Sequence, residues 1–144
     1  MIRKATPADI PKAIEIALEA LAIDPYPELV VSPERVRAAV TECISSAAHF
    51  AWVSEIEGEV VGGIGALVTP MIFHKRSQAS ILLWYCRTPG DGAALMRQFV
   101  SWCKSRPMIK QIQYTGERGA DPRVGALAKR CGLRETLPLY LMNK

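Results

Sequence analysis

Histidine and cysteine are scarce in this sequence, and neither forms a cluster. His49 and His74 are isolated, and the four cysteines are well separated along the chain. A zinc site needs such side chains at short spacings, so we expect no metal. Each cysteine lies in an apolar periodic segment and is predicted to act as a small buried hydrophobic residue. The four are Cys43, Cys86, Cys103 and Cys131.

Long hydrophobic runs are also missing. The longest, residues 60–68, contains three glycines and is far shorter than the roughly 20 apolar residues that span a bilayer. The start of the chain, residues 1–4, lacks the apolar stretch of a secretory signal. We therefore expect no membrane association and a cytoplasmic location.

The sequence has no strong excess of one charge. Lys and Arg number 18, Asp and Glu number 14, and the net charge is +4. Basic residues are dispersed apart from 74–76, which favours a solvated loop and makes nucleic-acid binding unlikely. With 144 residues, 49% of them hydrophobic, and no repeat or linker, the chain is predicted to form one domain over residues 1–144.

Hydrophobic periodicity and turn residues predict an alternation of strands and helices. Helices are expected to start at Pro7, at Pro33, after the glycines at 90 and 92, and at Pro122, the last with Val124, Leu127 and Cys131 facing inward. Strands are expected at residues 2–5, 50–55, 60–68, 81–86, 109–115 and 136–142, with a turn at Glu57 and Gly58.

One segment stands out, because the apolar residues 81–86 run directly into a glycine turn at 87–92 and then into a helix. Glycines let backbone N–H groups approach a ligand, and a helix start adds unpaired donors that favour an anion such as a phosphate. A dinucleotide fingerprint would need a further glycine where Leu95 stands, and no Gly-Lys-Ser/Thr exists for a Walker loop. An ordinary strand-to-helix turn is the alternative.

The pattern Arg-x-x-Gly-x-Gly-x-x-Leu, read at Arg87, Gly90, Gly92 and Leu95, resembles the acyl-CoA signature of the GNAT superfamily of N-acetyltransferases. The predicted element order is similar to the GNAT fold over the whole chain. A second local match covers the last helix, at Asp121, Val124, Leu127, Ala128, Gly132 and Leu133. The resemblance implies an α/β (α+β) fold with a mixed sheet of six to seven strands flanked by about four helices. The compact chain also resembles minimal acetyltransferases of bacteriophages.

For the cofactor, the resemblance implies acetyl-CoA. Strand 81–86 would splay from strand 109–115 to admit the pantetheine arm, and a backbone N–H near Trp84 or Tyr85 would stabilise the oxyanion. The implied cofactor-binding residues are Trp84, Tyr85, Cys86, Arg87, Gly90, Asp91, Gly92, Ala93 and Asp121. The turn departs from the family pattern, since Cys86 abuts Arg87 directly. Either the strand ends near residue 82 or 83, or the turn is short; Arg87 could bind phosphate or simply be solvated.

The implied reaction is acetyl transfer to a primary amine by direct attack in a ternary complex. Ala128 occupies the family's usual tyrosine position and has no proton to donate, and residues 79–86 contain no carboxylate. Tyr85 and Tyr114 are the candidate catalytic residues, with Glu117 third. For each tyrosine, the alternative is an aromatic residue that only packs in the sheet.

The acceptor is the least defined part of the site. In this fold it approaches between the loop at 23–32 and the last strand near 137–140, where Tyr26, Glu28 and Glu117 could attract an amine or could be ordinary polar residues. A small molecule, a peptide N-terminus and a protein lysine all remain open, as does a homodimer. The alternative functions are a catalytically weak or inactive protein that binds coenzyme A or a partner protein and, less favoured, a nucleic-acid binder.

Overall fold

The computed structural model describes residues 1–23, 29–88, 91–115, 122–136 and 142. These residues form five strands, four α-helices and one 3-10 turn, η1. The strands are β1 (Ile2–Lys4), β2 (Phe50–Ile56), β3 (Glu59–Pro70), β4 (Ser77–Cys86) and β5 (Ile109–Tyr114). The helical elements are η1 (Pro7–Asp9), α1 (Ile10–Leu21), α2 (Pro33–Ser45), α3 (Asp91–Lys104) and α4 (Pro122–Arg130).

The strands form one mixed sheet in the order β1-β2-β3-β4-β5. Neighbouring strands are antiparallel except for β4 and β5, which are parallel and are joined through α3. The predicted turn between β2 and β3 is confirmed, because Glu57 and Gly58 both have positive φ, 51° and 82°. Two consecutive residues of that kind make the tight turn that suits a twisted hairpin.

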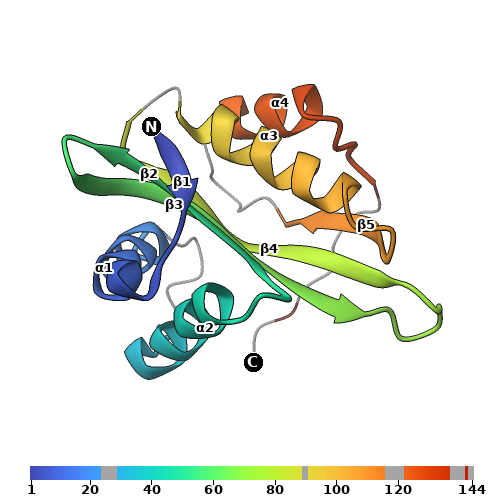
Figure 1. Cartoon of the computed structure of the whole chain (residues 1–144), viewed down its shortest axis with the longest axis horizontal. Coiled ribbons are helices and arrows are strands. Elements are labelled where there is room, and N and C mark those ends of the chain that lie inside the picture. Colours follow the sequence, from blue (N-terminus) through green and yellow to red (C-terminus); the bar gives the residue numbers. More distant parts are fainter. Residues whose placement is uncertain (24–28, 89–90, 116–121, 137–141, 143–144) are drawn as a thin grey trace.

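Helices cover both faces of the sheet (Figure 1). The α3 face holds the larger core, in which Phe50, Leu95 and Phe99 are almost fully buried. The face under α1 and α2 holds a smaller core that includes Ile16, Cys43 and Val53. Consecutive residues of a strand point to opposite faces, so β3 gives Ile64 to the α3 core and turns Gly63 and Gly65 toward α1 and α2.

A buried carboxylate, that of Asp9, directly precedes α1. Asp9 is 7% exposed and accepts hydrogen bonds from both guanidinium Nη atoms of Arg3, at 2.8 and 2.9 Å, and from the Thr6 backbone N–H at 2.7 Å. The Arg3 hydrogen bonds hold the pKa of Asp9 well below its usual value. These contacts attach β1 to the start of the helix and explain why Thr6 to Asp9 signals a helix start.

Four details differ from the sequence-based expectations. The described part of the chain has five strands rather than six to seven, and the strand expected at 136–142 falls mostly on residues outside it. β4 begins at Ser77 instead of residue 81, because the hairpin with β3 continues to Pro70. On α4, Ala128 is the buried residue, whereas Val124, Leu127 and Cys131 are half-buried, since α4 lies beside α3 rather than over the sheet centre (Figure 1). Cys43 and Cys103 are buried as expected, whereas Cys86 and Cys131 are only half-buried.

Candidate functional site

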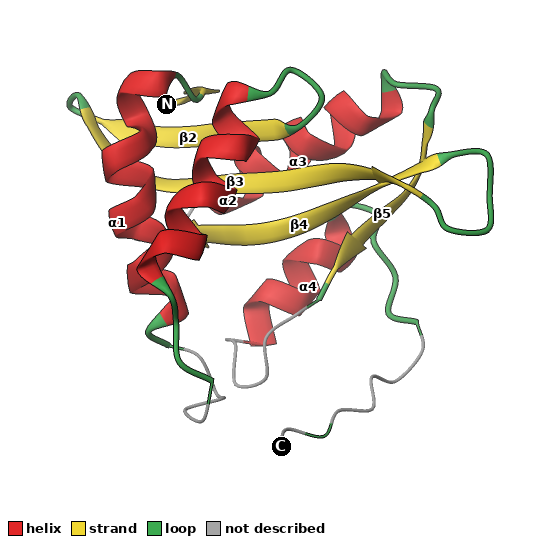
Figure 2. Cartoon of the chain, turned by 90° about the horizontal axis from the view of Figure 1, so that it is seen from below, coloured by secondary structure: helices red, strands yellow, loops and turns green. Residues whose placement is uncertain are grey.

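The site forms where β4 and β5 part. The two strands pair from Ser77 with Ile109 to Ile81 with Tyr114, and within the described residues no pairing continues beyond that point. β4 itself runs on to Cys86, held by β3 on its other side. Figure 2 shows the two strands diverging. The predicted splay is therefore present, and among the described residues no strand pairs with the outer edge of 82–86.

A bulge marks the point of separation. Along the β3–β4 ladder, Gly65 pairs with Leu83 and Ala66 pairs with Ile81, so Leu82 is an extra residue on β4. Such bulges bend a strand and are frequent next to active sites. The strand continues past the bulge, so of the two alternatives left open by the sequence, the short turn is the one observed.

The backbone alternation along β4 shows which amides point to the open edge. The Arg87 N–H donates to the Val61 carbonyl at 2.9 Å, which directs it toward β3. Hydrogen-bonding groups alternate sides along a strand, so those of Tyr85 also point to β3, and those of Trp84 and Cys86 point to the open edge. Of the two positions expected for an oxyanion donor, Trp84 is the one with an outward N–H.

The start of α3 is fastened next to this edge. The Trp84 indole Nε1 donates to the Gly92 carbonyl at 3.0 Å. The Ser54 hydroxyl, fully buried on β2, donates to the Asp91 carboxylate. A Cβ built on Gly92 would lie 3.6 Å from Trp84 Nε1, an ordinary contact, so the fold itself does not require glycine there. The first-turn N–H groups of a helix have no intrahelical partner and attract anions.

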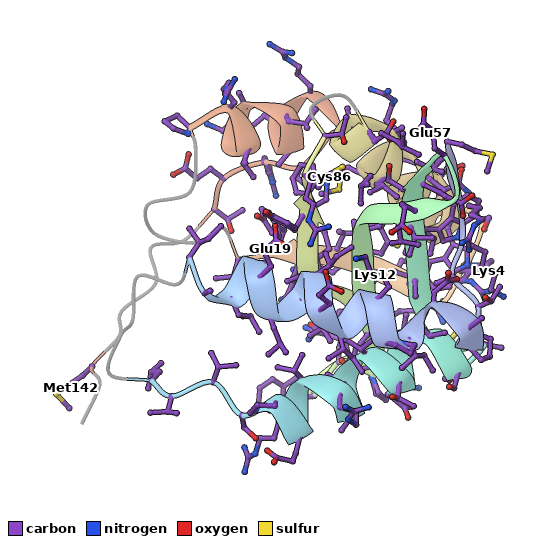
Figure 3. The ribbon with its side chains drawn as sticks, turned by 90° about the vertical axis from the view of Figure 1, so that its left-hand side faces the viewer. Lys4, Lys12, Glu19, Glu57, Cys86 and Met142 are labelled. Atoms are coloured by element: carbon purple, nitrogen blue, oxygen red, sulfur yellow. The ribbon has the colours of Figure 1, made fainter. Side chains whose placement is uncertain are left out.

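Arg87 does not extend freely into solvent. Its Nε lies 2.9 Å from Glu19 Oε2, its Nη2 also contacts Glu19, and the same Nη2 lies 3.2 Å from Glu15 Oε1. The Tyr85 hydroxyl donates to Glu19 Oε1 at 2.7 Å. Figure 3 shows Glu19 on α1, below the end of β4 that carries Cys86. An anionic ligand would have to compete with two carboxylates for Arg87.

The ionisation of this cluster follows from its contacts. Hydrogen bonds from Arg87 and then from Tyr85 lower the pKa of Glu19 to about 2, so Glu19 is a carboxylate at neutral pH. The same contact with Glu19 raises the pKa of Tyr85, which therefore stays protonated. Lys12 and Arg87 lower the pKa of Glu15. The cluster holds a hydroxyl proton between Tyr85 and Glu19 at the end of β4.

Comparisons with solved structures decide the fold. A predicted acetyltransferase from Clostridium acetobutylicum, solved with acetyl-CoA, superposes with a TM-score of 0.74 at 18% identity, over 99% of this chain and 95% of that one. A transcriptional regulator from Bacillus halodurans superposes with a TM-score of 0.74 at 20% identity, over 100% of this chain and 99% of that one. A third structure is an aminoglycoside acetyltransferase from an uncultured soil metagenomic sample, in complex with sisomicin. It superposes with a TM-score of 0.67 at 14% identity, over 100% of this chain and 96% of that one.

The chain has the GNAT fold. No protein-family model matches it, and no curated protein does so either. With identities of 20% or less, the likeness to these three structures establishes the architecture and leaves the reaction to be argued from the residues.

Within the GNAT fold, the two candidate tyrosines lie on opposite faces of the sheet. Tyr85 packs with the core under α1 and α2, and Tyr114 packs edge-on against Trp84 on the α3 face, with ring centroids 5.5 Å apart. Ala128, where the sequence resemblance leads us to expect a tyrosine, is 7% exposed. The structure thus brings Trp84, Tyr114 and Gly92 together on one side of the opening, and Tyr85 and Arg87 on the other.

Several predicted positions lie outside the described residues: Gly90, Asp121, Glu117, Tyr26, Glu28 and the segment 137–140. Over the described part, no group of three or more His, Cys, Asp or Glu side chains could hold a metal ion. No helix there combines the length and apolar composition needed to cross a bilayer.

Sequence reasoning missed Glu15, Glu19 and Ser54. A signal for the glutamates existed, because like charges four residues apart on a helix repel each other unless a cation lies nearby. Lys12 and Arg87 are those cations. The role of Ser54 could not be predicted, because the sequence does not show whether a serine in a strand faces solvent or the start of a helix.

Proposed function

We propose that this chain is an acetyl-CoA-dependent N-acetyltransferase that transfers an acetyl group to a primary amine by direct attack in a ternary complex. The observation that carries the proposal is the opening between β4 and β5 beyond Ile81, bordered by a bulge and ending at the start of α3. A strand edge with free N–H and C=O groups can pair with the amide-containing pantetheine arm much as another strand would.

The residues at the opening fit the coenzyme. Trp84 and Cys86 would hydrogen-bond the pantetheine and the thioester carbonyl through the backbone, while the first turn of α3, at Asp91 to Ala93, would receive the pyrophosphate. Gly90 and Asp121 stay in this proposal as cofactor-binding residues on the strength of the sequence alone. Arg87, which is engaged by Glu15 and Glu19, would act by fixing the end of β4 beside the ligand.

The chemistry would need little from the protein. The neutral amine nitrogen attacks the thioester carbon, the C–N bond forms and the C–S bond breaks. The nitrogen gives up one proton, and the coenzyme leaves as a thiolate that takes up a proton. A fixed Trp84 N–H at the thioester oxygen would stabilise the charge that develops there. Tyr85 and Tyr114 remain the two candidate acids, one from each face of the sheet, and water is the alternative.

A small-molecule amine is the proposed acceptor. One structure with the same fold is named an aminoglycoside acetyltransferase and was solved with sisomicin. In this chain, Glu15 and Glu19 place carboxylate oxygens on the α1 side of the opening, paired with Lys12 and Arg87, and these oxygens could also accept hydrogen bonds from an ammonium group. Peptide and protein amines are the competing outcomes of a substrate screen.

A catalytically inactive binder is the second candidate. Two observations favour it: Ala128 removes the family's usual acid, and one structure with this fold is named a transcriptional regulator. Such a protein would bind coenzyme A without releasing it as a reaction product.

Thermal unfolding with ligands tests the proposal first. Acetyl-CoA at about one hundred times its Kd should stabilise the fold by about 2.7 kcal/mol, which raises Tm by several degrees in a domain of this size. NAD and ATP at the same concentration serve as controls. Release of free thiol in the presence of an amine panel then separates the enzyme from the binder. No thermal shift with millimolar acetyl-CoA would remove the cofactor assignment.

A further inference from the structure

A large apolar cavity lies on the α1 and α2 side of the sheet. Its volume is about 410 Å³, and it is bounded by α1, α2 and the facing residues of β2, β3 and β4. Ligand pockets in proteins typically have volumes of about 300–1,000 Å³ and mostly apolar walls. Nothing in the mechanism proposed above uses this space.

Two glycines of β3 create the hollow. Gly63 and Gly65 turn their missing side chains toward α1 and α2, at positions where the neighbouring strand β2 presents Ala51 and Val53. A Cβ on Gly65 would lie 3.7 Å from Cys43 Sγ of α2, in ordinary van der Waals contact, so the glycine leaves a methyl-sized space beneath the helix at this point. The sheet floor therefore lies deeper here than beneath a strand with ordinary side chains.

The cavity walls select an apolar occupant. Among the described lining residues, Ser32, Arg35 and the Cys43 thiol are the hydrogen-bonding or charged side chains on this face, since the Trp52 indole packs in the core on the α3 face, and no carboxylate is present. An ammonium group placed there would lose its hydration without gaining a counter-ion, which is costly. A hydrocarbon chain gains free energy from the same burial.

The cavity reaches the opening between β4 and β5. Leu82 and Leu83 line it, and Leu82 is the bulge residue at which β4 leaves β5. Leu82 is 47% exposed, so the route from the open strand edge to the cavity passes a side chain that is not packed into the core.

We propose that the cavity binds the hydrocarbon tail of an acyl-CoA longer than acetyl-CoA. The proposal rests on the function proposed above, because the thioester must lie beside Trp84 for its tail to pass Leu82. The tail then occupies the apolar cavity bounded by α1, α2 and the sheet. The chain would accept medium-length acyl donors in addition to, or in preference to, the acetyl donor.

The affinities of a series of acyl-CoA thioesters test whether the acyl tail enters the cavity. Calorimetric titration of the full chain with acetyl-, butyryl- and hexanoyl-CoA should give Kd values that fall with chain length, since each buried methylene tightens binding by roughly fourfold. Hexanoyl-CoA should bind at least about tenfold more tightly than acetyl-CoA.

Adjacent alanines of α2 provide a matched pair of variants. Ala39 lines the cavity, whereas Ala38, one position away on the same helix, is exposed. Ala39→Leu should fill the cavity and abolish the advantage of hexanoyl-CoA while leaving acetyl-CoA binding within about twofold of the original value. Ala38→Leu adds the same atoms to the surface and should keep the advantage. Gly65→Ala adds a Cβ that fits in ordinary contact with Cys43, narrows the cavity from the sheet, and replaces Ala39→Leu if that variant does not fold.

The outcomes separate the two proposals. If acetyl-CoA and hexanoyl-CoA bind equally well, or if hexanoyl-CoA keeps its advantage in both cavity-filling variants, the tail does not enter the cavity and this inference is wrong, while the acetyltransferase proposal stands. If no acyl-CoA binds at all, both proposals fail together.

Discussion

Glu19 is the residue through which α1 reaches the end of β4. Its carboxylate accepts hydrogen bonds from Tyr85 and from Arg87, two residues on alternate positions of the strand end. Because Arg87 keeps Glu19 ionised, the carboxylate is a weak base but a strong hydrogen-bond acceptor. Glu19 therefore orients Tyr85 and Arg87 at the end of β4.

The catalytic roles of Tyr85 and Tyr114 can be distinguished by substitutions that remove only the hydroxyl group. Tyr85→Phe and Tyr114→Phe keep the ring and its packing, so their effect on kcat reports on chemistry. A positioned acid contributes about 10²- to 10⁴-fold, so one of the two variants should lower kcat at least tenfold with the best amine of the panel. Circular dichroism would verify that both remain folded. Wild-type turnover in both variants would exclude the tyrosines and favour water as the proton source.

A substitution at Gly92 should weaken ligand binding while leaving the stability of the fold nearly unchanged. A Cβ there would make one ordinary contact, 3.6 Å from Trp84 Nε1, so Gly92→Val should leave Tm within a few degrees of the wild-type value. The added methyl groups would occupy space at the first turn of α3 and should weaken acetyl-CoA binding at least tenfold. Gly125→Val on the exposed side of α4, where a Cβ meets no described atom within 4 Å, is the control. Equal affinity in the two variants would place the pyrophosphate elsewhere.

At the scale of elements, β1 and the start of α1 form one unit that orients α1 over the sheet. Arg3 bridges Asp9 at the helix start and Glu55 on β2, with 2.6 Å between its Nη2 and Glu55 Oε2. The position of α1 in turn sets where Glu19 meets β4. The stability of the Asp9 contacts therefore bears on the site, although Asp9 itself is remote from it.

Asp9 predicts a specific pH dependence of stability. Its pKa is lowered in the folded state, so its contribution is complete above the unfolded value of about 4 and is lost as the pH falls through and below that value. Asp9→Asn should lower the free energy of unfolding at pH 7 by about 1–3 kcal/mol. Urea unfolding at pH 7, 5 and 3 should show the difference from wild type shrinking toward pH 3.

A substitution of an exposed carboxylate is the control for the pH dependence predicted for Asp9. Glu57→Gln changes an exposed carboxylate in the β2–β3 turn and should alter stability by less than about 0.5 kcal/mol at every pH. A constant difference between Asp9→Asn and wild type across the pH range would mean that the charge of Asp9 does not stabilise the fold.

Most elements could be predicted because their signals are local. Pro7, Pro33 and Pro122 mark the helix starts, and the Glu57-Gly58 turn marks the hairpin. The early start of β4 could not be predicted, since Ser77 to Ser80 are polar or small and belong to a strand only through pairing with β3 and β5. Local propensity carries no information about that pairing.

At the scale of the whole molecule, the opening between β4 and β5 is the feature that the sequence predicted through its resemblance to the GNAT superfamily. The side-chain partners around it could not be predicted in this way. Arg87 and Glu19 are 68 residues apart, and Ser54 and Asp91 are 37 apart. Only the folded sheet brings them together. The homodimer, the cytoplasmic location and the resemblance to bacteriophage acetyltransferases stay predictions.

Amide hydrogen exchange with and without acetyl-CoA tests the central claim most directly, because it reads the open edge of β4 residue by residue. With saturating ligand, we expect slower exchange at the amides of Trp84 and Cys86 and in the first turn of α3. Exchange in the turn at Glu57 and Gly58 should be unchanged. Unaltered exchange at Trp84 and Cys86, with acetyl-CoA shown to be bound, would contradict the assignment of this opening as the coenzyme site.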